Sequence, residues 1–148
     1  MWIYATFGKL VTGTKNLTFL NLNNNAIRDL SVIATMSKLE ALSLSHNALT
    51  DLSQLSVLTN LKELDVSYNS LTSIAPLSSC TNLWAIDISG NKIDTLEGID
   101  ALTKLSVLKA DHNKLTDIHL LTANTLLTKL DLSHNSLISI APLAELNS

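Results

Sequence analysis

Apolar and polar residues alternate in short stretches that return every 22 residues along the chain. The stretch "NLTFLNLNNNAI" (16–27) returns as "KLEALSLSHNAL" (38–49), and further copies begin at residues 60, 82, 104 and 126. Every copy has an asparagine at the same position, and these asparagines are 22 residues apart: Asn25, Asn47, Asn69, Asn91, Asn113 and Asn135. A fixed period of this length indicates a solenoid, in which each unit packs mainly on its neighbours.

The first half of each copy predicts a short β-strand. In "LSLS" (42–45) the leucines alternate with serines, which is the period of a strand with one face in the core. We expect Leu42 and Leu44 to point inward and Ser43 and Ser45 outward. One strand cannot bury its leucines alone, so the strands of successive copies should pair in parallel, about 4.8 Å apart.

The second half of each copy predicts short helical turns. Its apolar residues step by three, as in "LTDLSQLSVL" (49–58), and this spacing suits 3₁₀ turns better than a long α-helix. Pro76 and Pro142 occupy matching places, and proline is tolerated in the first turn of a helix. We therefore expect turns near 76–79 and 142–145.

The asparagine column has a different physical cause. The chain must turn over the core after each strand, and the backbone groups of that turn need partners. An asparagine side chain offers two donors and an acceptor, so we expect these residues to bond the turns of their own and adjacent copies. Cys80, the only cysteine, occupies a leucine position and is predicted to be a small buried hydrophobe.

The pattern LxxLxLxxNxLxxLxxLxxLxx resembles the leucine-rich repeat, and its 22-residue form is similar to that of the bacterial internalins and of the nuclear regulatory subunit of protein phosphatase 1. The resemblance covers about residues 17–148. It implies an α/β solenoid: a right-handed curved superhelix with a parallel concave β-sheet and short 3₁₀ or helical turns on the convex side. It also implies a role in protein binding.

The period divides the chain into a leader and six repeats. Residues 1–16 are interpreted as a degenerate N-terminal half-repeat. The repeats are 17–38, 39–60, 61–82, 83–104, 105–126 and 127–148. The last repeat carries no polar cap, and a solenoid exposes its core at an uncapped end. We expect the chain to be part of a longer protein; the alternative is end-to-end self-association through the C-terminal repeat.

Composition narrows the classes of partner. The formal net charge of −3 gives no reason to expect nucleic acid. No stretch approaches the roughly 18 apolar residues of a membrane span, and "MWIYATFGKLVTG" does not look like a signal peptide. Membrane insertion is therefore not expected.

Outward strand positions and their neighbours form the predicted protein-binding face. The candidates are Phe19, Glu63, Asp65, Tyr68, Trp84, Asp87, Lys109, Asp111, Lys129 and Asp131. Acids outnumber bases, which favours a basic partner, although Lys109 can instead pair with Asp87 and Asp131 on the neighbouring strands. Tyr68 and Trp84 are included because tyrosine and tryptophan are enriched in binding hot spots.

The sequence gives less support to metal binding and catalysis than to protein binding. His112 and His134 fall on adjacent repeats, and two imidazoles about 5 Å apart could share a metal. No further strong ligand is fixed beside them, so no metal site and no cofactor is predicted. Phosphate-binding loops, CxxC pairs, nucleophile elbows and HExxH motifs are absent from the sequence. The chain is not expected to be an enzyme.

The function predicted from these observations is a protein-interaction module. As the internalin resemblance implies, it would come from a bacterial surface or secreted protein. Two alternatives remain open: a cytoplasmic regulatory or scaffolding subunit like the phosphatase regulator, and a structural spacer.

Overall fold

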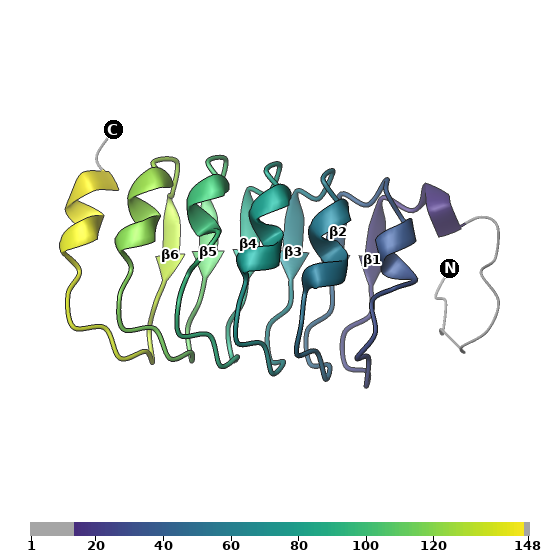
Figure 1. Cartoon of the computed structure of the whole chain (residues 1–148), viewed down its shortest axis with the longest axis horizontal. Helices are drawn as coiled ribbons and strands as arrows, with labels where there is room; N and C mark the ends of the chain where they lie inside the picture. The colour runs from purple at the N-terminus through teal and green to yellow at the C-terminus, as the bar shows by residue number, and fades with distance from the viewer. Residues whose placement is uncertain (1–13, 147–148) are drawn as a thin grey trace.

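The computed structural model describes residues 14–146, which form one six-stranded parallel sheet backed by 3₁₀ turns. The strands are β1 (Phe19–Asn21), β2 (Ala41–Ser43), β3 (Glu63–Asp65), β4 (Ala85–Asp87), β5 (Val107–Lys109) and β6 (Lys129–Asp131). They follow one another in chain order along the long axis, with the helical turns in a second row (Figure 1). Most of the predicted half-repeat, residues 1–13, lies outside the described residues.

Each return segment contains a 3₁₀ turn, as the three-residue spacing of the leucines predicts. The turns are η1 (Thr14–Asn16), η2 (Ile33–Thr35), η3 (Ser53–Val57), η4 (Ala75–Ser79), η5 (Ile99–Ala101), η6 (His119–Ala123) and η7 (Ala141–Leu146). The turns expected after Pro76 and Pro142 are confirmed as η4 and η7. A 3₁₀ helix has three residues per turn, so side chains three residues apart lie on the same side. The leucines at this spacing therefore face the core.

The strands pair with a constant offset of 22 residues. Ala41 lies opposite Glu63, and Lys109 lies opposite Asp131. The parallel sheet predicted from the repeat is therefore confirmed. Because the register never slips, outward residues at the same place in each repeat form columns across the sheet.

The core lies between the sheet and the turns. Its buried leucines and isoleucines run from Leu30 to Leu121, and Leu130, Leu132 and Leu137 of the last repeat are only partly buried. Cys80 is fully buried among them, as predicted, and burial raises the pKa of its thiol to about 11. None of the described helices is long and apolar enough to cross a bilayer.

The asparagines link successive turns. The amide Nδ2 of Asn91 donates to the backbone C=O groups of Val66, Ile88 and Ser89, at 3.1, 3.0 and 3.2 Å. Its Oδ1 accepts the N–H of Leu71 at 3.0 Å. The same four-bond pattern is repeated by Asn47, Asn69, Asn113 and Asn135.

Two buried polar positions depart from the pattern of the repeat. Ser45 is predicted to point outward, but Ser45 and Ser67 are buried and their hydroxyls bond each other at 2.8 Å. The chain begins to turn at these serines, so their side chains lie against the next repeat. Asn124 occupies a leucine position and is fully buried. Its Nδ2 donates to the backbone of Ile99 and Leu102, while its Oδ1 has no partner.

Candidate protein-binding face

The first and third residues of each strand project from the sheet on the side away from the turns. We call these twelve positions the sheet face: Phe19, Asn21, Ala41, Ser43, Glu63, Asp65, Ala85, Asp87, Val107, Lys109, Lys129 and Asp131. The middle residue of every strand points into the core instead. The sheet face is therefore a direct product of the strand period acting in constant register.

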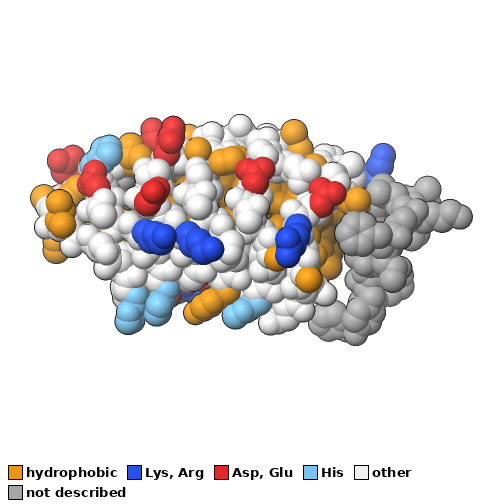
Figure 2. All heavy atoms as spheres, turned by 60° about the horizontal axis from the view of Figure 1, so that its bottom comes forward, with side chains coloured by type: hydrophobic (Ala, Val, Ile, Leu, Met, Phe, Trp, Pro, Cys, Tyr) orange, Lys and Arg blue, Asp and Glu red, His pale blue; other side chains and the backbone are white. Residues whose placement is uncertain are grey.

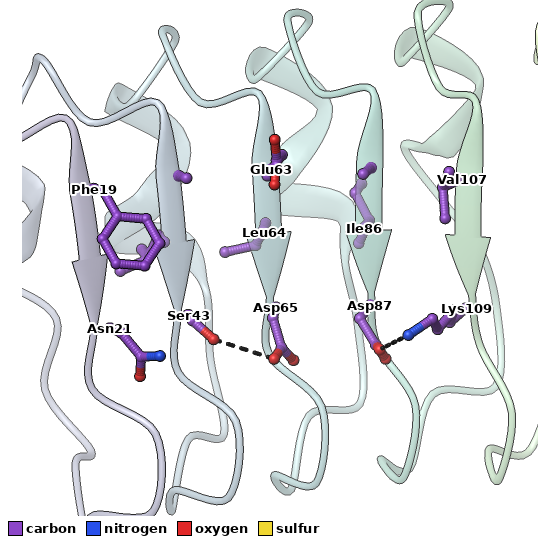
Figure 3. Close-up of a pocket in the computed structure, with 13 residues that line it drawn as sticks. Phe19, Asn21, Ser43, Glu63, Leu64, Asp65, Ile86, Asp87, Val107 and Lys109 are labelled. Atoms are coloured by element: carbon purple, nitrogen blue, oxygen red, sulfur yellow. Dashed lines mark hydrogen bonds and ion pairs between the residues drawn. The ribbon is translucent and has the colours of Figure 1, made fainter.

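A shallow hollow of about 310 Å³ lies on the sheet face over β1–β5. Its floor is low because Ala41 and Ala85 have only methyl side chains. Figure 3 shows Phe19 toward one end, Lys109 toward the other, and Glu63 between them. The hollow is open, so it can admit side chains of a protein surface but does not enclose a small molecule.

The hollow brings together half of the predicted contact residues. Those that line it are Phe19, Glu63, Asp65, Asp87 and Lys109. Tyr68 and Trp84 lie beside it, at the two ends of the strands, with 48% and 41% of their surfaces exposed. Asp111, Lys129 and Asp131 lie nearer the C-terminal end of the sheet and outside the hollow.

The aspartates at the ends of the strands have a local structural role that sequence reasoning missed. Each accepts the backbone N–H two residues later: Asp65 from Ser67 at 3.0 Å, and Asp131 from Ser133 at 3.0 Å. These are Asx turns, which Asp followed two residues later by Ser could have signalled. The N–H and hydroxyl of Ser133 lower the pKa of Asp131. The acidic column is thus partly a set of caps for the turns.

Ion pairing neutralises only part of the negative charge. The Nζ of Lys109 lies 3.1 Å from Asp87, and this hydrogen bond and the charge of Asp87 raise the pKa of Lys109 (Figure 3). The predicted second pairing, with Asp131, is not formed. Glu63 and Asp65 of β3 have no ion-pair partner among residues 14–146. The uncompensated charge is therefore concentrated near the middle of the hollow.

A row of rings follows the turns at one edge of the sheet. His46 stacks on Tyr68 with ring centroids 4.5 Å apart, and His112 stacks on His134 at 4.0 Å. Figure 2 shows histidine and hydrophobic side chains projecting in a row along this edge. All four residues have φ between 52° and 54°, so each occupies the left-handed region at the same point of its turn. Sequence reasoning missed the stacking because it depends on this shared backbone conformation.

Gly90 interrupts the row for a steric reason. A Cβ at this position would lie 2.6 Å from Cδ1 of Tyr68, closer than real contacts allow. The glycine also has φ of +64°, a left-handed conformation that glycine adopts without the steric strain that a Cβ causes. Gly90 therefore lets the Tyr68 ring lie over the next turn.

The stacked imidazoles do not converge on a common ion. Rings at an interplanar angle of 20° direct their in-plane lone pairs nearly parallel. The Nδ1 of His112 is already engaged with Asp111 at 2.8 Å. Burial acts to raise the pKa of Asp111, but hydrogen bonds from Ser89 and His112 lower it overall. Within residues 14–146 no three His, Cys, Asp or Glu side chains are grouped to hold a metal.

Trp84 lies at the N-terminal end of β4, where other repeats have smaller or charged residues. Its backbone N–H donates to the C=O of Lys62 at 2.9 Å. This bond aligns Trp84 with Lys62, the equivalent residue of the preceding repeat, beside the sheet face. In the same column, Lys62 pairs with Glu40 at 2.9 Å. The indole is therefore a partly exposed apolar surface next to a salt bridge.

Comparison with known families and structures agrees with this architecture. A family model described as leucine-rich repeats (two copies) matches residues 15–57 and 59–101, and a leucine-rich repeat model matches 123–139. A comparison with curated protein sequences gave no significant match.

Several solved structures share the fold. Internalin C2 from Listeria monocytogenes is 31% identical with a TM-score of 0.82, over 90% of this chain and 69% of that one. An internalin from the same organism is 30% identical with a TM-score of 0.78, over 94% and 49%. A leucine-rich repeat protein from Leptospira interrogans is 30% identical with a TM-score of 0.80, over 88% and 34%.

The repeat period, the parallel sheet, the asparagine bonds and the family matches lead to one conclusion. The chain belongs to the leucine-rich repeat family, and its fold is that of the internalins.

Proposed function

We propose that the sheet face binds a protein surface that carries a basic side chain close to an apolar one. A leucine-rich repeat fold is a protein–protein interaction module, and the observation that carries the finer proposal is the hollow. Glu63 and Asp65 supply uncompensated charge at its centre, and Phe19, 63% exposed, supplies an apolar wall. Charge of one sign on a preorganised surface favours an oppositely charged partner and speeds its association.

The second part of the proposal concerns the parent protein. Similarity to two Listeria internalins and a Leptospira protein supports a bacterial surface or secreted protein. A cytoplasmic regulatory or scaffolding subunit is the alternative. The chain spans 49% and 34% of two of these relatives, so parent sequence on either side would separate the two cases. Binding without catalysis is the role proposed in either case.

Affinity capture with matched charge variants tests the face. Glu63→Lys is the informative change because the Glu63 side chain has no partner in the described structure. Glu97→Lys changes the net charge equally but lies on a return segment, next to η5. We expect proteins that the wild-type chain captures to be lost with Glu63→Lys and kept with Glu97→Lys.

Two outcomes would reject the proposal. If the two variants lose the same partners, the sheet face is not the binding surface. If neither variant nor Phe19→Ala loses any, the chain acts as a spacer or binds through another side.

A further inference from the structure

Glu63 has the only carboxylate in the hollow whose oxygens are both free among residues 14–146. Its side chain makes no hydrogen bond and no ion pair with the described residues. Asp65, by contrast, accepts three hydrogen bonds from serines, at 2.6, 3.0 and 3.1 Å. Asp87 is paired with Lys109 at 3.1 Å. A donor group of a partner that enters the hollow therefore finds its best acceptor in Glu63.

A space lies beside this carboxylate, between β1 and β3. Ala41 stands opposite Phe19 on one side and opposite Glu63 on the other. Phe19 and Glu63 are thus two strands apart, or roughly 10 Å at the backbone. Only the methyl group of Ala41 occupies the sheet face between them. We call this space the Ala41 slot.

The Phe19 ring forms the second side of the Ala41 slot. Figure 3 shows the ring face-on between β1 and β2, with Glu63 on the following strand. The residue is 63% exposed, so the face of the ring is open to a partner. A flat group laid on this ring would direct its edge toward the Glu63 carboxylate.

The opposite side of Glu63 has different surroundings. There Ala85 lies between Glu63 and Val107, and the neighbouring side chain is aliphatic rather than aromatic. The Nζ of Lys109 also lies on that side, beside Asp87. Its positive charge repels a second cation. A basic group that pairs with Glu63 is therefore favoured in the Ala41 slot and disfavoured over Ala85.

We propose that the basic side chain bound by the sheet face is an arginine in the Ala41 slot, with its guanidinium stacked on Phe19 and hydrogen-bonded to Glu63. This inference rests on the proposed function and names the partner's basic group. A guanidinium is planar, stacks on aromatic faces and donates two parallel N–H bonds to a carboxylate. A lysine ammonium is compact and strongly hydrated, so it cannot make both contacts in this way.

Peptides selected from a random displayed library on the immobilised wild-type chain serve as probes. We expect the selected peptides to be enriched in arginine at one position. Replacing that arginine by lysine should weaken binding to the wild-type chain about five- to tenfold in calorimetric titration. Phe19→Leu removes the ring but keeps an apolar side chain, and should reduce this difference to about twofold or less. Glu63→Gln should weaken the arginine and lysine peptides alike.

One substitution on the two sides of Glu63 supplies the matched control. Ala41→Leu fills the Ala41 slot and should abolish the preference for arginine over lysine. Ala85→Leu adds the same side chain on the other side and should keep the ratio of the two affinities. Circular dichroism checks that every variant is folded.

The outcomes separate this inference from the proposed function. Selected peptides whose affinity is unchanged by Glu63→Lys would reject the sheet face as the binding surface, and the arginine contact with it. Peptides that depend on Glu63 but bind equally well with lysine would overturn the arginine contact alone. Preference for arginine that persists in Phe19→Leu or Ala41→Leu would do the same.

Discussion

At the scale of single residues, Asn124 is the position where the core departs most from its own pattern. Earlier repeats have a leucine at the equivalent position, as at Leu58 and Leu102. The Oδ1 of Asn124 is buried there without a hydrogen-bond partner among the described residues. The carbonyls that its Nδ2 contacts, of Ile99 and Leu102, already accept backbone N–H groups. Both carbonyls therefore keep a hydrogen bond when the asparagine side chain is removed.

Asn124→Leu should consequently stabilise the fold. It removes a buried unsatisfied acceptor and restores apolar packing, with an expected gain of about 1–2 kcal/mol in the free energy of unfolding. Urea unfolding measures the gain. Asn124→Ala is the control, because it removes the acceptor without filling the space and should gain less. A destabilised Asn124→Leu would show that Oδ1 has a partner, such as a bound water.

Cys80 makes a prediction about pH. Burial raises the thiol pKa from 9.0 to about 11, so above pH 9 the unfolded chain loses this proton while the folded chain keeps it. The free energy of unfolding should therefore fall as pH rises from 9 to 11, by roughly 2 kcal/mol from this group. Cys80→Val lacks the thiol and should show a shallower decline. Equal declines in the two proteins would contradict the assignment.

At the scale of elements, the asparagine column joins one repeat to the next. In Asn91→Ala the N–H of Leu71 loses its partner in the core, while Val66 and Ile88 keep bonds from Asn69 and Asn113. The expected loss is about 1–3 kcal/mol of unfolding free energy for that one buried group.

Asn25→Ala is the matched control for this loss. Asn25 makes two local bonds, its side chain is exposed, and its Oδ1 accepts no N–H from another repeat within the described residues. Its replacement should cost less than about 1 kcal/mol. Similar losses for the two variants in denaturant unfolding would show that the bonds between repeats are not what stabilises the column.

The elements were predictable because each is encoded many times. Alternation in "LSLS" and the three-residue leucine step specify the strand and the turn, and the constant period specifies the register. The burial of Ser45 and the stacking of His112 on His134 could not be read in the same way. Both depend on the left-handed turn after each strand, which directs side chains toward the neighbouring repeat rather than away from the sheet.

The candidate site was predictable only as a set of positions. The repeat placed Glu63, Asp87 and Lys109 on one face, but it could not show that Lys109 would choose Asp87 over Asp131. That choice depends on side-chain geometry within a fixed register. It also determines which acids of the hollow remain uncompensated: Asp87 is paired, and Glu63 and Asp65 are not.

At the scale of the whole molecule, the constant 22-residue offset joins the outward residues of six strands into one continuous face. That face presents a hollow with a negative centre over β1–β5. The 3₁₀ turns lie in a separate row behind the sheet and leave the hollow uncovered (Figure 1).

Hydrogen-exchange footprinting of the chain with a captured partner shows whether the partner binds to the sheet face. We expect slower amide exchange along β2–β4 and in the turns carrying His46 and Tyr68, with no change in η3–η6. Protection confined to η3–η6 would contradict it and place the partner on the opposite side of the solenoid.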